Sequence, residues 1–233
     1  MLKKFVLWGH RLNDYKEMFN LSDEFLANNQ IVEYGSGITS FNAEMAKLGR
    51  RVVSIDPMYA LTLDDIKSHV SEVFELTLSK IKNNKEKYNW KNHDELAALI
   101  EMRRKGINLF YADFEKGREE GRYLTGIDPS VLTAENSCFD LALITHHLFV
   151  NFVDHGVDEH VALILEMIKI AGEVNIFPLL DKFGQISKLL GPVMLSLQQR
   201  ELGLEVCQVG SQLQKSGNAM LRVWAVACEI KKS

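Results

Sequence analysis

The sequence predicts an α/β fold in which helices cover both faces of a mainly parallel sheet. Two observations predict it. Short apolar runs, which suit strands buried on both faces, alternate along the 233 residues with longer segments of helical period. The last two runs are separated only by residues 210–218, a gap too short for a helical crossover, so they should pair antiparallel. We expect one domain over residues 1–233.

The short apolar runs are the predicted strands. They occupy Ile31–Tyr34, Val52–Ile55 and residues 107–111, 141–145, 174–177, 204–209 and 220–226. Helices are expected between them, over residues 40–48, Val157–Ile170 and residues 187–202. The first should end at Gly49 and the last at Gly203, because glycine commonly follows a helix C-terminus.

The segment from residue 59 to residue 106 is longer than a single crossover between two strands requires. Its length predicts a helical insertion between the second and third strands. Apolar residues fall on one helical face at Leu63, Ile66, Val70, Phe74, Leu78 and Ile81. A polar stretch follows, and Asp94 then opens a second predicted helix over residues 95–105. The apolar face suits either packing over a binding site, together with residues 11–26, or a dimer interface. Monomer and homodimer both stay open.

The composition gives no sign of a nucleic-acid or membrane partner. The formal net charge of −4 provides no electrostatic reason to expect nucleic acid. No apolar run approaches the length that spans a membrane, and the N-terminal run is too short for a signal peptide. The cysteines, Cys138, Cys207 and Cys228, are odd in number and far apart, which favours buried thiols in a reducing compartment. We expect a cytoplasmic protein.

The strongest local signal is a strand that ends in an acidic residue and turns through two glycines into a helix. It reads Glu33-Tyr34-Gly35-Ser36-Gly37. The first glycine permits a tight turn, and the second lets a ligand approach the backbone. The next strand ends in Asp56, where a carboxylate beside the glycine turn can hold a ribose diol. The alternative is that Asp56-Pro57 is only a turn.

Two further strand ends should border the same site. The predicted third strand ends at Asp113, whose carboxylate can accept a bond from an adenine amino group, with Phe114 beside the ring; the alternative is a helix cap. The fourth strand ends at Thr145 and His146, which should face the site because open parallel sheets bind ligands at the carboxyl ends of strands. His146 would take a proton from a nucleophile, or else bond a backbone carbonyl or cap a helix.

Two positions indicate which nucleotide binds. A dinucleotide-binding turn needs a third glycine or alanine where this chain has Ser40. Glu33 stands where a pyrophosphate would lie, and its carboxylate repels a phosphate but suits the ammonium and sulfonium of S-adenosylmethionine. We therefore expect S-adenosyl-L-methionine as the cofactor and NAD as the less favoured alternative.

The chain resembles class I S-adenosylmethionine-dependent methyltransferases and, among them, a bacterial family of unassigned substrate. The glycine turn and Ser54-Ile55-Asp56-Pro57 are similar to the first two cofactor motifs, and the likeness continues in residues 117–123, 139–143, 145–149, 173–180 and 217–221. It covers almost the whole chain and implies a Rossmann-like seven-stranded methyltransferase sheet. The chain departs from the pattern at Thr39, which replaces the third glycine of the turn, and at His147, where the family usually has a bulky apolar residue.

The predicted cofactor-binding residues come from these strand ends and turns. They are Glu33, Tyr34, Gly35, Ser36, Gly37, Asp56, Pro57, Asp113, Phe114, Thr145 and His146. His146 is also the candidate catalytic base. A metal site is not expected, because His155 and His160, with Asp154 and Asp158, have no familiar ligand spacing.

The sequence thus predicts transfer of a methyl group from S-adenosylmethionine to an unidentified acceptor, which we take to be a small molecule. Arg118, Arg122 and Tyr123 either contact an acidic group of that acceptor or solvate a loop. The Asn-Pro-Pro-Tyr type of motif is absent, which argues against a nucleic-acid substrate. Two alternatives stay open: a catalytically silent S-adenosylmethionine-binding protein that acts through a partner, and an NAD-dependent oxidoreductase.

Overall fold

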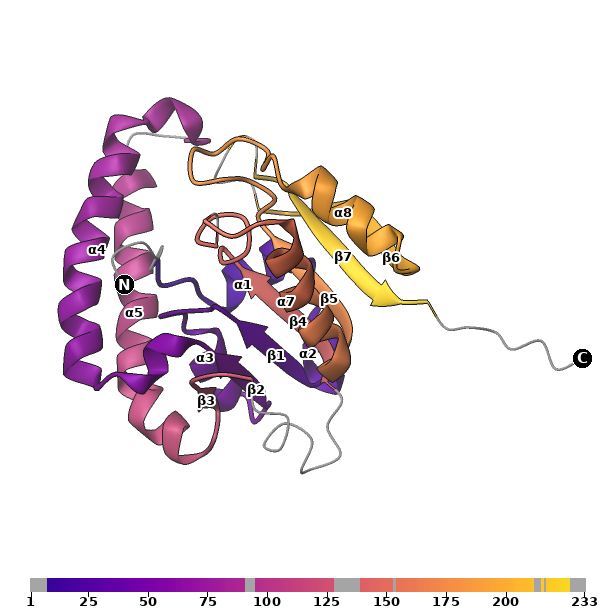
Figure 1. The fold of residues 1–233 in the computed structure, drawn as a ribbon. Coiled ribbons are helices and arrows are strands. Elements are labelled where there is room, and N and C mark those ends of the chain that lie inside the picture. Colours follow the sequence, from indigo (N-terminus) through magenta and orange to yellow (C-terminus); the bar gives the residue numbers. More distant parts are fainter. Residues whose placement is uncertain are drawn as a thin grey trace, which may run out of the picture.

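The computed structural model describes residues 8–90, 95–127, 139–152, 154–211, 215 and 217–226, which contain one seven-stranded sheet flanked by helices (Figure 1). The strands are β1 (Ile31–Tyr34), β2 (Val52–Ile55), β3 (Tyr123–Leu124), β4 (Phe139–Thr145), β5 (Ala171–Phe177), β6 (Leu202–Gln208) and β7 (Ala219–Ala225). Their order is β3-β2-β1-β4-β5-β7-β6. Strands β1 to β5 are parallel, and β7 is antiparallel to both of its neighbours. The predicted Rossmann-like sheet with an antiparallel last strand is confirmed.

Helices cover both faces of the sheet. They are α1 (Leu12–Phe19), α2 (Asp23–Asn28), α3 (Phe41–Lys47), η2 (Pro57–Ala60), α4 (Leu63–Asn83), η3 (Lys85–Lys87), α5 (Glu95–Glu119), α7 (Val157–Ile170) and α8 (Leu190–Gln198). One core lies between the sheet and α7 and α8, and a second lies between the opposite face and α1 to α3. A third core joins α4, α5 and η2. Helices α4 and α5 run side by side as a long pair at one end of the molecule (Figure 1).

The helical insertion after the second strand is confirmed, but the prediction of a strand at residues 107–111 is wrong. Helix α5 includes these residues, and Ile107, Phe110 and Phe114 share the core of α4 and η2. A short apolar run fits either a buried strand or the buried face of a helix. Here the run continues a helical face, and the third strand is the two-residue β3, which pairs with β2.

The N-terminal segment, residues 8–11, lies against α5 where two glycines meet. A Cβ on Gly106 would overlap the carbonyl oxygen of Gly9, whose φ of +62° lies in the left-handed region. Arg11 then pairs with Glu44 of α3, with Nη2 and Oε2 2.9 Å apart. The segment is thereby fixed between α5 and α3.

Two composition-based expectations can be compared with the described residues. No helix in that part of the chain is long and apolar enough to cross a membrane. Cys207 lies on β6 and is half-buried, so it is more exposed than expected. Cys138 and Cys228 lie outside the described residues.

Candidate functional site

The predicted site residues at strand ends meet beside β1, β2 and β4. Strand β1 lies between β2 and β4, and the chain proceeds outward from β1 to β3 on one side and from β4 to β5 on the other (Figure 1). Open parallel sheets bind ligands at this kind of topological switch point, outside the carboxyl ends of the strands. The side chains that follow these three strands are therefore the first candidates for a site.

The glycine turn after β1 is closely packed. Gly35 and Gly37 have φ values of +67° and +62°, in the region that glycine adopts without strain. A Cβ on Gly35 would overlap the imidazole of His147, which follows β4. The Tyr59 hydroxyl lies 3.0 Å from Ser36 Oγ and donates to the carbonyl oxygen of Gly37 at 2.6 Å. Only glycine at position 35 leaves room for the His147 ring.

Asp56 follows β2, and its carboxylate binds two backbone amides. Oδ2 accepts from the Gly37 N–H at 3.0 Å, and Oδ1 accepts from the Met58 N–H at 2.9 Å. Burial raises the pKa of Asp56, although both amides oppose the increase. The turn that the sequence left as an alternative is therefore formed, with Pro57 exposed at the start of η2. Each carboxylate oxygen keeps a further lone pair, so a ribose diol is compatible with this geometry.

Glu33 is buried, with 1% of its surface exposed. Ser54 Oγ donates to Oε1 at 2.5 Å, whereas Oε2 makes no hydrogen bond of normal geometry among the described residues, although the Tyr15 and Ser36 hydroxyls lie near the carboxylate. Burial raises the pKa of Glu33 to about 7. A cationic group at Oε2 would favour the charged carboxylate and reverse this effect. Beside it, Tyr34 is half-buried, with its ring edge-on to the His147 ring at 5.3 Å.

Three buried hydroxyls gather beside Glu33, and none makes a hydrogen bond of normal geometry among the described residues, although the Tyr15 hydroxyl lies near enough to the other two and to Glu33 to interact with them. They belong to Tyr15 of α1, Thr39 after the glycine turn and Thr145 at the end of β4. Burial and the nearby Glu33 carboxylate raise the pKa of Tyr15 well above its ordinary value. Buried polar atoms are nearly always bonded in folded proteins. Unpartnered oxygens from three different elements therefore mark a place suited to a polar ligand.

His146 follows Thr145 with a φ of +53°, an uncommon value for a residue with a side chain. Its backbone N–H donates to the carbonyl oxygen of Phe177 at 2.7 Å, and its ring stacks on His10 with centroids 4.7 Å apart. His146 Nδ1 and both ring nitrogens of His10 are buried without partners among the described residues. Burial, aided by Arg103, lowers the pKa of His146 to about 3 and that of His10 well below its ordinary value. Both imidazoles are therefore uncharged at neutral pH.

Arg103 of α5 brings a buried positive charge beside this stack. It is 3% exposed, and its Nη1 donates to Asp14 Oδ2 at 2.5 Å. The same oxygen lies 3.9 Å from His10 Nδ1. Arg103 Nε is buried without a partner among the described residues, and the guanidinium lies 5.8 Å from the centroid of the Trp8 ring. Helix α5 thus contributes a cation to the end of β4.

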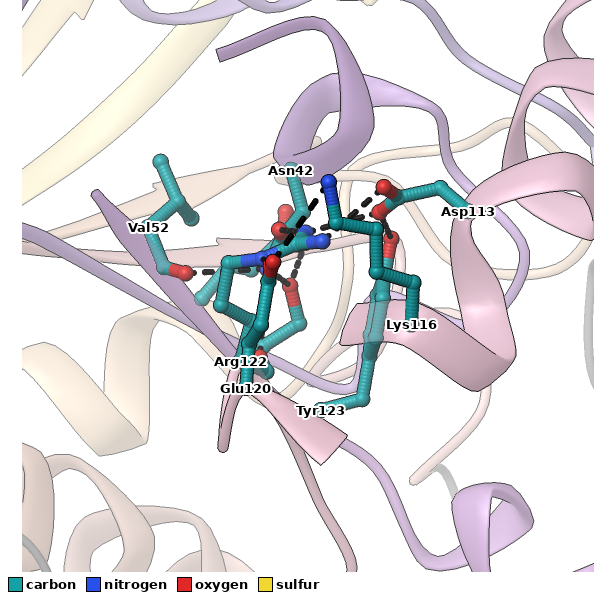
Figure 2. Close-up of polar contacts among 9 residues, drawn as sticks. Asn42, Val52, Asp113, Lys116, Glu120, Arg122 and Tyr123 are labelled. Carbon is teal, nitrogen blue, oxygen red and sulfur yellow. Dashed lines mark hydrogen bonds and ion pairs between the residues drawn. The ribbon is translucent and has the colours of Figure 1, made fainter. Parts of the chain in front are cut away.

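Asp113 and Phe114 do not follow a strand as expected, because they lie inside α5. Asp113 accepts from Arg122 Nη1 at 2.7 Å, from Arg122 Nη2 at 2.9 Å and from the Tyr123 hydroxyl at 3.0 Å (Figure 2). Phe114 is fully buried and packs on the ring of Tyr59. The interpretation of both residues as adenine contacts loses its basis. Arg122 and Tyr123 hold α5 to the sheet edge instead of solvating a loop.

A chain of buried hydrogen bonds joins this ion pair to Glu33. Arg122 Nη1 donates to Asn42 Oδ1 at 2.5 Å, and Asn42 Nδ2 donates to Ser54 Oγ at 2.7 Å. Figure 2 shows Asn42 beside the Arg122 side chain, with Asp113 on its other side. Because Ser54 Oγ accepts from the amide, its own proton is free to be donated to Glu33. The network therefore fixes Oε1 of Glu33 as a hydrogen-bond acceptor.

The histidines after β4 that raised the question of a metal have other contacts. His160 has ring nitrogens 2.7 Å from the carbonyl oxygen of Gly156 and 3.0 Å from that of Leu148. His155 stacks on Phe152 with centroids 3.7 Å apart. Within the described ranges, no group of three or more His, Cys, Asp or Glu side chains is arranged to hold a metal ion.

Sequence reasoning missed His10, Tyr15 and Arg103, which reach the site from elements outside the strand ends. Arg103 was the easiest of the three to detect from the sequence, because it shares a helical face with apolar Leu99 and Ile107. A charged residue on an apolar face is rarely buried without a partner. No local pattern marks His10, whose place depends on a contact with α5.

The comparisons with known proteins give one sequence relative and several similar structures. No family model matches the chain. An uncharacterised protein of Methanocaldococcus jannaschii is 26% identical over 221 residues, which are 94% of this chain and 96% of that protein. Magnesium protoporphyrin IX methyltransferase from Synechocystis, with bound S-adenosylhomocysteine, aligns at a TM-score of 0.47 and 10% identity, over 91% of this chain and 81% of that one. N-methyltransferase NodS from Bradyrhizobium japonicum aligns at 0.44 and 13% identity, over 92% and 87%.

Proposed function

We propose that this chain is an S-adenosylmethionine-dependent methyltransferase, as the sequence resemblance implies. The observation that carries the proposal is the pair of buried carboxylates at the switch point of the sheet. Glu33 has an unpartnered Oε2, and Asp56 lies against the glycine turn. A buried carboxylate oxygen without a donor suits a cationic ligand group and opposes a pyrophosphate.

The residues present fit this cofactor at two places. Glu33 Oε2 would accept bonds from the ammonium group, with the unpartnered hydroxyls of Tyr15 and Thr39 nearby. Asp56 would accept bonds from the ribose diol with its remaining lone pairs, while Gly37 keeps that edge free of a side chain. When bound, S-adenosylmethionine supplies a methyl group activated by a positively charged sulfur.

The contribution of the chain to methyl transfer is positioning and the handling of one proton. Thr145 and His146 end the strand beside β1 and would border the reacting groups. The imidazole of His146, with a pKa of about 3, is uncharged at neutral pH and can accept a hydrogen bond from a nucleophile. We take the acceptor to be a small molecule, because the chain has a net charge of −4 and lacks the Asn-Pro-Pro-Tyr type of motif after the fourth strand.

Calorimetry tests the cofactor directly. The wild-type protein should bind S-adenosylhomocysteine and should give no heat with NAD. Asp56→Asn should weaken S-adenosylhomocysteine binding by about 1–3 kcal/mol, because charge-assisted bonds to the ribose diol are lost. Tight NAD binding without a response to S-adenosylhomocysteine would overturn the proposal.

A matched control lies at the other end of the sheet. Asp140 is near the start of β4, is exposed, and accepts from the Gln30 N–H at 2.7 Å. Asp140→Asn should leave S-adenosylhomocysteine affinity unchanged. Formation of S-adenosylhomocysteine from S-adenosylmethionine, with any acceptor, then separates an enzyme from a silent cofactor-binding protein.

A further inference from the structure

We propose that His10, Arg103 and His146 form the acceptor subsite and that the atom methylated is the oxygen of an uncharged hydroxyl group. This inference rests on the proposed function, because it names the acceptor class for the same site. It is carried by a cluster of buried nitrogen atoms that have no hydrogen-bond partner among the described residues. The cluster combines the N-terminal segment, α5 and the end of β4.

The cluster is built from rigid parts. His10 is 7% exposed and stacks on His146. Its backbone carbonyl accepts from the Ser40 N–H at 2.8 Å, directly after the glycine turn. On its other side, the crossing of Gly9 and Gly106 leaves no room for movement toward α5. The ring of His10 is therefore held between α5 and the predicted cofactor residues.

The unpartnered atoms define what the subsite can bind. Arg103 Nε is a donor and can never accept. An uncharged imidazole has one donor and one acceptor nitrogen, and both ring nitrogens of His10 are buried without partners among the described residues. A ligand group that both accepts and donates satisfies this set. A hydroxyl does so with one atom, because its oxygen accepts from an N–H and its proton goes to an imidazole nitrogen.

The charges of the cluster favour an uncharged group over an ion. The guanidinium of Arg103 is already paired with Asp14, so the two cancel. An alkylammonium would find no uncompensated anion in this buried place, and a carboxylate would find no uncompensated cation. Burying either ion without a counter-charge is costly. The uncharged state of both imidazoles is consistent with a neutral ligand.

Methyl transfer in this arrangement forms one bond and breaks one. The hydroxyl oxygen forms the new bond to the methyl carbon, and the sulfur of S-adenosylmethionine keeps the electron pair of the bond that breaks. Attack leaves a protonated ether oxygen, which is acidic enough to give its proton to an unprotonated imidazole nitrogen of His10 or His146 despite their lowered pKa. The proton passes to water when the product leaves. Before attack, Arg103 Nε–H donates to the hydroxyl oxygen and orients it.

Three small aromatic probes test the acceptor class. Phenol, benzylamine and benzoate present a hydroxyl, an ammonium and a carboxylate on the same benzene ring. Each is titrated into the protein saturated with S-adenosylhomocysteine, and the ring nitrogens of ¹⁵N-labelled histidines are followed by NMR. Phenol should shift the signals of His10 and His146, and the two ions should not do so at tenfold higher concentration. A stronger response to either ion, or no response to phenol, would overturn the inference.

A variant pair tests the role of His10. His10→Phe keeps a ring against His146 and removes both nitrogens, so phenol affinity read at His146 should fall about tenfold, the effect of one lost hydrogen bond. His155→Phe changes an exposed imidazole and should leave phenol affinity unaltered. Unchanged phenol affinity in His10→Phe would refute the subsite. If calorimetry detects no S-adenosylhomocysteine binding to the wild-type protein, the proposed function fails first, and this inference fails with it.

Discussion

At the scale of single residues, Glu33 combines a cost in stability with a use in binding. Its carboxylate is buried, and one oxygen has a donor in Ser54 while the other has none among the described residues. A charge in this position is unfavourable until a cation joins it. The residue therefore links the pH dependence of folding to the proposed ammonium subsite.

Glu33→Gln should remove part of the pH dependence of stability. Folding raises the pKa of Glu33 from 4.5 to about 7, so the folded protein keeps a proton that the unfolded chain loses in this range. The free energy of unfolding should therefore fall by roughly 3 kcal/mol through this residue as the pH rises across that interval. Glutamine keeps an oxygen for Ser54 and carries no charge. In urea denaturation, the variant should gain stability relative to wild type between pH 5 and pH 8; parallel profiles would contradict this account.

At the scale of elements, α5 makes three separate contacts with the rest of the molecule. Near its start Arg103 faces the His10 and His146 stack, in its middle Gly106 receives the N-terminal segment, and near its end Asp113 holds Arg122. A 25-residue helix can do this because its buried face passes from the end of β4 to the edge of the sheet. The middle contact is the one that a single added methyl group would break.

Gly106→Ala tests that contact against the intrinsic preference of a helix. Alanine in a helix interior is favoured over glycine by about 1 kcal/mol, yet here its Cβ would overlap the backbone oxygen of Gly9. We expect a net loss of about 1–3 kcal/mol, the usual cost of overpacking. Gly191 of α8 is the control, because a Cβ there meets nothing within 4 Å. Thermal unfolding should show a clearly lower Tm for Gly106→Ala and only a small change for Gly191→Ala, which directly precedes Pro192 in the first turn of its helix. A stabilised Gly106→Ala would mean that residues 8–11 do not lie against α5.

The sequence predicted the elements that have a local signal and missed those that depend on distant contacts. Strands β1 and β2 were predicted with their observed bounds, because each is a short buried run beside a turn. Residues 107–111 form a similarly short apolar run but belong to a helix, and only their packing on α4 distinguishes this run from a strand. Strand β3 has two residues and no periodicity to detect. Among the candidate site residues, those at the ends of β1, β2 and β4 could be predicted, whereas His10 enters through a long-range contact.

At the scale of the whole molecule, one buried polar network ties the insertion to the sheet. Arg122 contacts Asp113 of α5, Asn42 of α3 and Glu120, and the chain of bonds continues through Ser54 to Glu33. Removing one member of such a network leaves its buried neighbours without their partner, which is costly. Loss of one member should therefore affect helix docking and the candidate site together.

Arg122→Met should destabilise the protein by about 3–5 kcal/mol, because it leaves the Asp113 carboxylate partly buried without its cation. The double variant Asp113→Leu, Arg122→Met should lose less than Arg122→Met alone, since no charge is then left without a counter-charge. Arg118→Met, which changes an exposed arginine of the same helix, should have little effect. Urea unfolding of the three variants measures these differences. A double variant less stable than Arg122→Met would mean that the hydrogen bonds of Arg122 to Asn42 and Glu120, and not its pairing with Asp113, hold α5 in place.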